Sequence, residues 1–166
     1  MKIYITGVAG TGKTSIARAL KEKGISAIDL DTISHMENKT TGEIVHWNPG
    51  ASDEWIQAHD WVCDIPKLKD FLSISENSVV VGHTANQKDY LSLFDKIFVL
   101  SCRPETITQR IQNRTDNDFG KHPEDLARIL NWNKEFTGWM LELGAEVLDG
   151  EKPLNEIVKH LISLLK

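Results

Sequence analysis

Residues 7–14 read Gly-Val-Ala-Gly-Thr-Gly-Lys-Thr, and this stretch decides the fold. It fits the G-x-x-x-x-G-K-[ST] pattern of a phosphate-binding loop, in which glycines let the backbone turn successive N–H groups toward an anion. We expect Lys13 to face the β- and γ-phosphates of a nucleotide and the Thr14 hydroxyl to join the shell of a Mg²⁺ ion. The motif predicts nucleotide contacts at Gly7, Ala9, Gly10, Thr11, Gly12, Lys13, Thr14 and Ser15.

The segments on either side of this loop supply the context that the motif requires. Residues 2–6 are rich in β-branched and aromatic side chains, which is typical of a buried strand. Residues 15–23 carry apolar side chains near helical spacing, and Gly24 ends the helix that they predict. The loop would therefore present a bound phosphate to a helix N-terminus, where the macrodipole favours negative charge.

The composition bounds the class of protein. With 166 residues, 40% hydrophobic and 26% charged, the chain predicts one globular domain over residues 1–166. A net charge of −5 gives no basic footprint for nucleic acid, and no apolar run is long enough for a membrane span. Cys63 and Cys102 fit buried thiols better than a disulfide framework or a metal site. We expect a soluble cytoplasmic protein without nucleic-acid or membrane partners; the sequence indicates no oligomeric state.

The rest of the chain alternates between apolar strands and amphipathic helices. Further strands are predicted at residues 25–28, 78–82, 96–101 and 145–148, and further helices at 68–72, 104–114, 123–143 and 153–165. Unbroken apolar runs such as residues 79–81 indicate strands that are buried on both faces. This alternation predicts a three-layer α/β/α fold around a five-stranded parallel sheet. Residues 32–66 show no clear period.

Acidic residues after the second strand distinguish between classes of phosphate-loop protein. A GTPase needs Asn-Lys-x-Asp, whereas residues 38–41 read Asn-Lys-Thr-Thr. Large ATPases need an acid at the end of a later strand, but the third and fourth strands here run into residues 82–83 (Gly-His) and 101–102 (Ser-Cys). Only the second strand leads into carboxylates, at Asp29 and Asp31, and this arrangement suits a kinase.

A cationic segment follows the fourth strand. Arg110 and Arg114 are four residues apart on the predicted helix and lead into a polar, glycine-containing stretch that ends at Lys121. Phosphoryl transfer spreads negative charge over the γ-oxygens, so a mobile cationic lid would stabilise that charge and exclude water. We expect such a lid at about residues 114–122, with catalytic roles for Arg110 and Lys121. The alternative is a solvated helix end with favourable cations.

Together these features resemble the small nucleotide-kinase-like phosphate-loop proteins, particularly the shikimate kinase and adenylate kinase branch. The resemblance rests on residues 7–14, 29–31, 110–121 and 148–153. Residues 81–87 are also similar to bacterial phosphate-loop ATPases that have no assigned activity. The resemblance implies a sheet with strand order 2-3-1-4-5 and a reaction that uses ATP with Mg²⁺.

The resemblance also implies roles for individual residues. Asp29 would lie near the metal, and Asp31 would act as the base that orients the acceptor hydroxyl. Arg114 would pack on the adenine, and Pro153 would border it from the loop before the last helix. Lys121 would be the catalytic cation of the lid.

The expected acceptor-binding region, about residues 32–66, departs from that family. No arginine lies between Arg18 and Arg103, and the region holds six acids against Lys39 as its one base. Without arginine a bidentate clamp on carboxylate or phosphate is hard to build, which argues against shikimate and monophosphates as acceptors. The Gly-Gly-Gly stretch of shikimate kinases is also replaced, by Gly-His-Thr at residues 82–84.

Aromatic side chains in the same region favour a neutral or cationic small-molecule acceptor with a flat or apolar face. The alternative is that they cover the edge of the sheet as ordinary core residues. His46 and His59 have no partner at metal-ligand spacing, whereas His83, directly after the third strand, is a candidate substrate contact. The tryptophans concerned are Trp47, Trp55 and Trp61.

Three functions stay open from the sequence. The first is an ATP-dependent kinase that acts on a neutral or cationic small molecule. The second is a nucleoside-monophosphate kinase, of the adenylate kinase type, whose clamp uses Lys39, Lys67 or Lys69 in place of arginine. The third is an ATP-binding regulatory module with little turnover.

Overall fold

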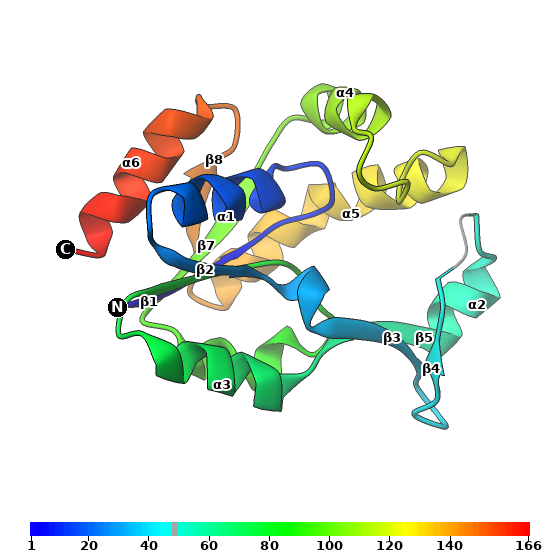
Figure 1. Cartoon of the computed structure of the whole chain (residues 1–166). Coiled ribbons are helices and arrows are strands. Elements are labelled where there is room, and N and C mark those ends of the chain that lie inside the picture. The colour runs from blue at the N-terminus through cyan, green and yellow to red at the C-terminus, as the bar shows by residue number, and fades with distance from the viewer. Residues whose placement is uncertain (48–49) are drawn as a thin grey trace.

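The main sheet has five parallel strands, as the sequence predicts. A computed structural model describes residues 1–47 and 50–166 (Figure 1). The strand order is β2-β6-β1-β7-β8, and every neighbouring pair is parallel. Counted along the chain within this sheet, that order is 2-3-1-4-5, so the predicted order is confirmed. The strands are β1 (Lys2–Thr6), β2 (Ser26–Asp29), β6 (Ser78–Val81), β7 (Lys96–Ser101) and β8 (Glu146–Asp149).

Helices cover both faces of this sheet because alternate strand residues point to opposite sides. Ile3 and Ile5 pack with α1 and α6, whereas Tyr4 packs with α3, and Val99 with α4 and α5. The three-layer architecture is therefore confirmed. The helices are α1 (Lys13–Glu22), α3 (Ile65–Ile74), α4 (Pro104–Asn113), α5 (Pro123–Glu142) and α6 (Leu154–Leu164), with the 3₁₀ turns η1 (Leu30–Thr32), η2 (Gln87–Asp89) and η3 (Leu91–Leu93).

A second, antiparallel sheet forms where the sequence shows no period. Its strands β3 (Ser34–Asn38), β4 (Ile44–Val45) and β5 (His59–Cys63) lie in the order β4-β3-β5, and α2 (Asp53–Ala58) precedes β5. We call residues 34–63 the arm; Figure 1 shows it extending away from the main sheet. The backbone N–H of Asp64 donates to the carbonyl of Ile33 at 3.0 Å. The arm therefore leaves and rejoins the main body at one place.

The remaining structural expectations are met in part. Cys63 and Cys102 are both buried free thiols. The lid segment, residues 114–122, links α4 to α5 without a helix or strand. Within the described residues, no helix combines the length and apolar character that crossing a membrane requires.

Candidate active site

The phosphate-binding loop connects β1 to α1 and is shaped by its glycines. Gly10 and Gly12 have φ angles of 82° and 104°, in the left-handed region that favours glycine. A Cβ on Gly10 would lie 2.9 Å from Ile111 and 3.1 Å from the Ile107 carbonyl. The Thr11 hydroxyl donates to the Val8 carbonyl at 2.8 Å and closes the loop on itself. The loop is thus held in shape and packs directly on α4.

Lys13 lies inside this loop. Its Nζ donates to the carbonyls of Gly7 and Val8, at 2.6 and 2.9 Å. Burial lowers the pKa of Lys13, while the carboxylates of Asp31 and Asp29 act in the opposite direction. The ammonium is therefore positioned beside two acids and can meet an anion at the mouth of the loop.

Thr14 and Asp29 meet beside the loop, as the magnesium prediction requires. The Thr14 hydroxyl donates to Asp29 Oδ2 at 2.6 Å, and Asp29 Oδ1 accepts the backbone N–H of Asp31 at 3.1 Å. Asp29 thereby caps η1 and places its carboxylate at the C-terminal end of an edge strand. No cluster of three His, Cys, Asp or Glu side chains suited to a metal occurs in the described part of the chain. One carboxylate and one hydroxyl nevertheless fit Mg²⁺, which takes its other ligands from water and phosphates.

Asp31 lies on η1, at the junction between the main sheet and the arm. Its side chain is open to solvent on one side, yet the surrounding protein partly desolvates it. This desolvation and the neighbouring charge of Asp29 raise the pKa of Asp31, whereas Lys13, the indole N–H of Trp61 and Arg114 act to lower it. A carboxylate with a raised pKa beside the phosphate loop can accept a proton from an acceptor hydroxyl.

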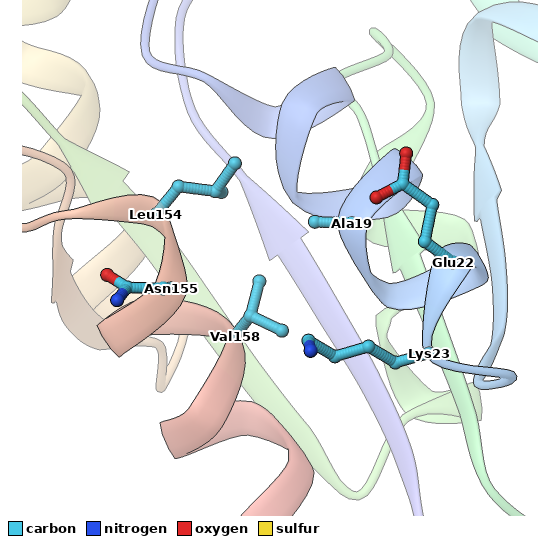
Figure 2. Close-up of a pocket in the computed structure, with 6 residues that line it drawn as sticks. All are labelled: Ala19, Glu22, Lys23, Leu154, Asn155 and Val158. Atoms are coloured by element: carbon cyan, nitrogen blue, oxygen red, sulfur yellow. The ribbon is translucent and has the colours of Figure 1, made fainter.

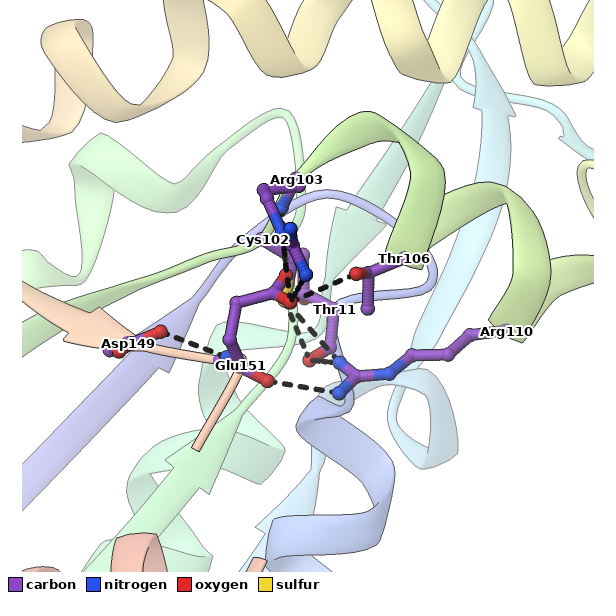
Figure 3. A network of polar contacts seen from close by, with 8 residues as sticks. Thr11, Cys102, Arg103, Thr106, Arg110, Asp149 and Glu151 are labelled. Carbon is purple, nitrogen blue, oxygen red and sulfur yellow. Dashed lines mark hydrogen bonds and ion pairs between the residues drawn. The ribbon is translucent and has the colours of Figure 1, made fainter. Parts of the chain in front are cut away.

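Arg110 occupies a different place from the one expected. Its Nη1 donates to the Thr11 carbonyl at 2.9 Å, and its Nη2 donates to the Gly150 carbonyl at 2.9 Å (Figure 3). Nη1 also lies 3.3 Å from Cys102 Sγ. The guanidinium therefore joins the phosphate loop to the loop before α6, instead of standing free in a lid.

Arg114 points to the other end of the site, because the helix ends one residue earlier than predicted. Its backbone is extended (φ −72°, ψ 148°), so it does not share the helical face of Arg110. Its guanidinium donates to the Phe119 carbonyl, and its charge acts on both Lys13 and Asp31. Arg114 thus lies on the phosphate side, and Arg110 takes the position beside residues 149–152 that the resemblance implied for Arg114.

The two remaining predicted residues lie at the ends of α5 and α6. Pro153 is the N-cap residue of α6, directly after the loop that Arg110 contacts. Lys121 pairs with Asp118 at 2.9 Å within the lid segment. The charges that act most on Lys13 come from Asp31, Asp29 and Arg114.

His83 is half-buried beside this charge cluster, and its Nδ1 atom is buried. Its ring meets the edges of Trp132 and Phe136, with centroids 4.4 and 4.9 Å apart. Burial, reinforced by the charge of Lys13, lowers the pKa of His83 to about 3, so the ring is neutral. Trp132 keeps 43% of its surface exposed. Trp132 lies within the helix predicted at residues 123–143, but only the structure shows that it stays this exposed beside His83.

The three arm tryptophans have three different surroundings. The Trp61 indole reaches Asp31, as its effect on the pKa of that acid indicates. Trp55 stacks on His59 within the arm, at a centroid distance of 4.1 Å. Trp47 meets Phe119 of the lid segment edge to face, at 5.2 Å. Only Trp61 is therefore placed to line an acceptor site next to Asp31.

A cluster around Asp125 fixes the arm to α5, and sequence reasoning missed it. Asp125 is 1% exposed and accepts from Arg128 Nη1 at 3.0 Å and from the Gly50 N–H at 3.2 Å. Arg128 also donates to Asp53 Oδ1 at 2.7 and 2.9 Å and to the Ala51 carbonyl at 2.9 Å. We call these contacts the latch. An arginine from outside residues 32–66 thus reaches the arm, but two carboxylates already engage it.

A separate hollow lies between α1 and α6 (Figure 2). Its volume is about 460 Å³, and it is lined by Ala19, Glu22, Lys23, Leu154, Asn155 and Val158. None of these residues belongs to the charge cluster around Lys13. The hollow therefore plays no part in the candidate site.

Comparisons with known proteins identify the family of the chain. A family model described as "AAA domain" matches residues 3–131, most of the chain. A protein named "putative adenylate kinase" from Methanocaldococcus jannaschii is 33% identical over an alignment that covers 97% of this chain and 86% of that protein. The chain belongs to the family that this model describes and is similar to this relative over nearly its whole length. The resemblance to nucleotide-kinase-like phosphate-loop proteins is thereby confirmed.

Two further similarities are more limited. A "putative adenylate kinase" from Halobacterium salinarum is 28% identical, and the aligned part covers 70% of this chain and 60% of that protein. The chain therefore spans less than two thirds of the length of that relative. The solved structure of deoxyadenosine kinase from M. mycoides with bound dATP aligns over 99% of both chains, with a TM-score of 0.56 and 18% identity. This similarity shows a shared fold.

Proposed function

We propose that this chain transfers the γ-phosphoryl group of ATP to a small-molecule acceptor bound between Asp31 and the arm. The observation that carries the proposal is the 2.6 Å contact between the Thr14 hydroxyl and Asp29, two residues before Asp31. This contact brings the phosphate loop, two oxygen atoms suited to Mg²⁺ and the candidate base Asp31 close together. Mg²⁺, when bound to Thr14 and Asp29, would neutralise charge on the β- and γ-phosphates.

Each of these residues has a defined task in this reaction. Lys13 and the loop N–H groups stabilise the negative charge that spreads over the γ-oxygens. Asp31 orients the acceptor hydroxyl and accepts its proton as the new oxygen–phosphorus bond forms, while the bond to the β–γ bridging oxygen breaks and leaves ADP. Arg114 supplies a second cation on the phosphate side. We assign Gly150 and Pro153 to the base end of the nucleotide, and Lys121 to the lid.

The acceptor side favours a neutral or cationic molecule. Lys39 pairs with Asp60 at 3.2 Å, and Lys67 pairs with Asp64 at 2.8 Å. His83 is neutral, and Arg128 is held by the latch. Trp61 next to Asp31 offers a flat, apolar face. A nucleoside, a sugar or an amine-bearing molecule fits these surroundings better than a dianionic phosphate.

A nucleoside-monophosphate kinase is the second candidate, because similar family members carry the name "putative adenylate kinase". This function would require a cation to exchange its carboxylate partner for the acceptor phosphate. Arg128 or one of the paired lysines would have to do so.

Coupled measurement of ADP release separates the two candidates. Nucleosides, sugars, amino alcohols and nucleoside monophosphates are each offered with ATP, with and without Mg²⁺, to the protein and to its Lys13→Ala variant. Acceptor-dependent ADP release with a neutral or cationic compound, lost in the variant, supports the first candidate. Release with monophosphates alone supports the second, and ATP binding without release with any acceptor overturns both.

A further inference from the structure

We propose that Glu151 is a positioning residue that fixes the loop at the base end of the ATP site. The proposal rests on the proposed function, because it takes that site to bind ATP. Glu151 would act through the backbone of residues 149–152 and would not itself contact the nucleotide. Nothing in the phosphate-loop motif points to this residue.

Glu151 holds the N-terminus of α4 with both carboxylate oxygens (Figure 3). Oε1 accepts the backbone N–H of Arg103 at 2.9 Å. Oε2 accepts from Arg103 Nη2 at 3.0 Å and from the Thr106 hydroxyl at 2.9 Å. These donors, led by the Arg103 backbone N–H, lower the pKa of Glu151 and keep it ionised. The Glu151 N–H in turn donates to Asp149 Oδ1 at 2.9 Å, which makes the loop a compact turn.

The same loop is tied to the phosphate loop through Arg110. One guanidinium bridges the carbonyls of Thr11 and Gly150. Gly150 also lies so close to Cys102 Sγ that a Cβ there would collide with it. Arg110, Arg103 and Thr106 all belong to α4 or to its N-cap position, so this one helix sets the separation between the two loops.

These contacts predict that Glu151 affects binding of the base and does not affect binding of the phosphates. The phosphate loop has its own hydrogen bonds and its packing on Ile107 and Ile111, which do not involve Glu151. In Glu151→Gln the acceptor oxygens no longer match the donors from Arg103 and Thr106, so the loop loosens. Contacts to the base would weaken, while contacts to the phosphates would persist.

Calorimetric titration with two probes tests the proposal. ATP reaches both ends of the site, whereas inorganic tripolyphosphate reaches only the phosphate loop. We expect Glu151→Gln to weaken ATP binding about tenfold and to change tripolyphosphate binding less than about twofold. Glu156→Gln, an exposed glutamate in the first turn of α6, is the matched control and should bind both probes as the parent does.

The outcomes separate this proposal from the proposed function. Equal weakening of both probes, or no change in either, would overturn the role of Glu151. A parent protein that binds neither probe would overturn the proposed function, and this inference with it. Thr106→Val removes one donor to the same carboxylate and provides a milder variant if Glu151→Gln does not fold. It should weaken ATP binding about twofold and leave tripolyphosphate binding unchanged.

Discussion

We call the phosphate loop, Asp29 and the loop at residues 149–152 the donor half of the proposed site, and it and the arm are held in place in different ways. The donor half consists of short loops whose bonds connect near neighbours, such as Thr11 to Val8, or backbone carbonyls to α4. The arm is an antiparallel sheet whose far end is secured by the latch on α5. A motif can encode the phosphate loop, whose Thr11 bonds to Val8 three residues away, whereas the latch depends on residues that are distant in the chain. The phosphate loop is therefore readable in the sequence, and the arm is not.

The largest effect should come from removing the charge at the centre of the donor half. Lys13→Ala should lower kcat/KM by about 10³-fold, because a positioned cation no longer meets the charge on the transferring group. Steady-state kinetics measure this, with Lys21→Ala on the exposed side of α1 as the control. Parent-like turnover in Lys13→Ala would disprove the role of the loop in the reaction.

The next effect tests the point where the two regions meet. Asp31→Asn should lower kcat by about 10²-fold or more, because the acceptor hydroxyl loses its base. ATP affinity should change little, since Asp31 is assigned to the acceptor. Single-turnover assays and ATP titration measure both quantities, with exposed Asp70→Asn as the control. A loss confined to ATP affinity would place Asp31 in the donor half instead.

Breaking the latch should loosen the arm and leave the donor half unchanged. Arg128→Met leaves the buried Asp125 carboxylate without its cation and should lower the free energy of unfolding by about 3 kcal/mol. This is the lower end of the usual cost, because Arg128 keeps 29% of its side chain exposed. Asp53→Asn removes only the exposed partner and should cost less than about 1 kcal/mol.

Urea unfolding and acceptor titration check the latch prediction. We expect acceptor KM to rise in Arg128→Met at unchanged ATP affinity. Equal destabilisation by both substitutions, or a parallel loss of ATP affinity, would show that the arm and the donor half are not separately held.

The smallest effect concerns His83, between the two regions. In the folded protein, burial lowers the pKa of His83 from the ordinary 6.5 to about 3. Between these two pH values the unfolded chain therefore binds a proton at His83 that the folded protein does not bind. Stability therefore falls as the pH drops below 6.5. Between pH 7 and pH 5 this residue should account for about 2 kcal/mol of lost stability. His83→Phe keeps an aromatic ring against Trp132. Between pH 7 and pH 5, its free energy of unfolding in urea should therefore fall by about 2 kcal/mol less than that of the parent. An equal loss in parent and variant would mean that His83 is not buried neutral.

Much of the donor half could be predicted because its residues act locally. The spacing in residues 7–14 fixes the loop, and Asp29 follows directly from the strand that carries it. The positions of Arg110 and Arg114 relative to each other could not be predicted, because four-residue spacing places them on one face only if the helix continues. It ends at Asn113, and the extended backbone of Arg114 turns that side chain toward Lys13 and Asp31.

The arm escaped prediction for a physical reason as well. β3 reads Ser-His-Met-Glu-Asn and lacks the regular apolar alternation that marks a half-buried strand, and β4 has only two residues. Its pairing with β5 joins residues 21 to 29 positions apart, from Asn38–His59 to Ser34–Cys63. Arg128 reaches the arm from 75 positions beyond Asp53, a contact that spacing does not reveal.

The hydrogen bond between Asp64 and Ile33 has a consequence for how this molecule could be rebuilt. Because the entry and exit strands of the arm meet there, the arm has one junction with the main body along the chain, and the latch on α5 holds its far end. Such sites tolerate replacement of the inserted segment, since the flanking backbone need not move. A different recognition element could be grafted at this junction while β2, β6 and the phosphate loop keep their registry. Under the proposed function, the fold thus separates the part that selects the phosphoryl acceptor from the part that binds ATP.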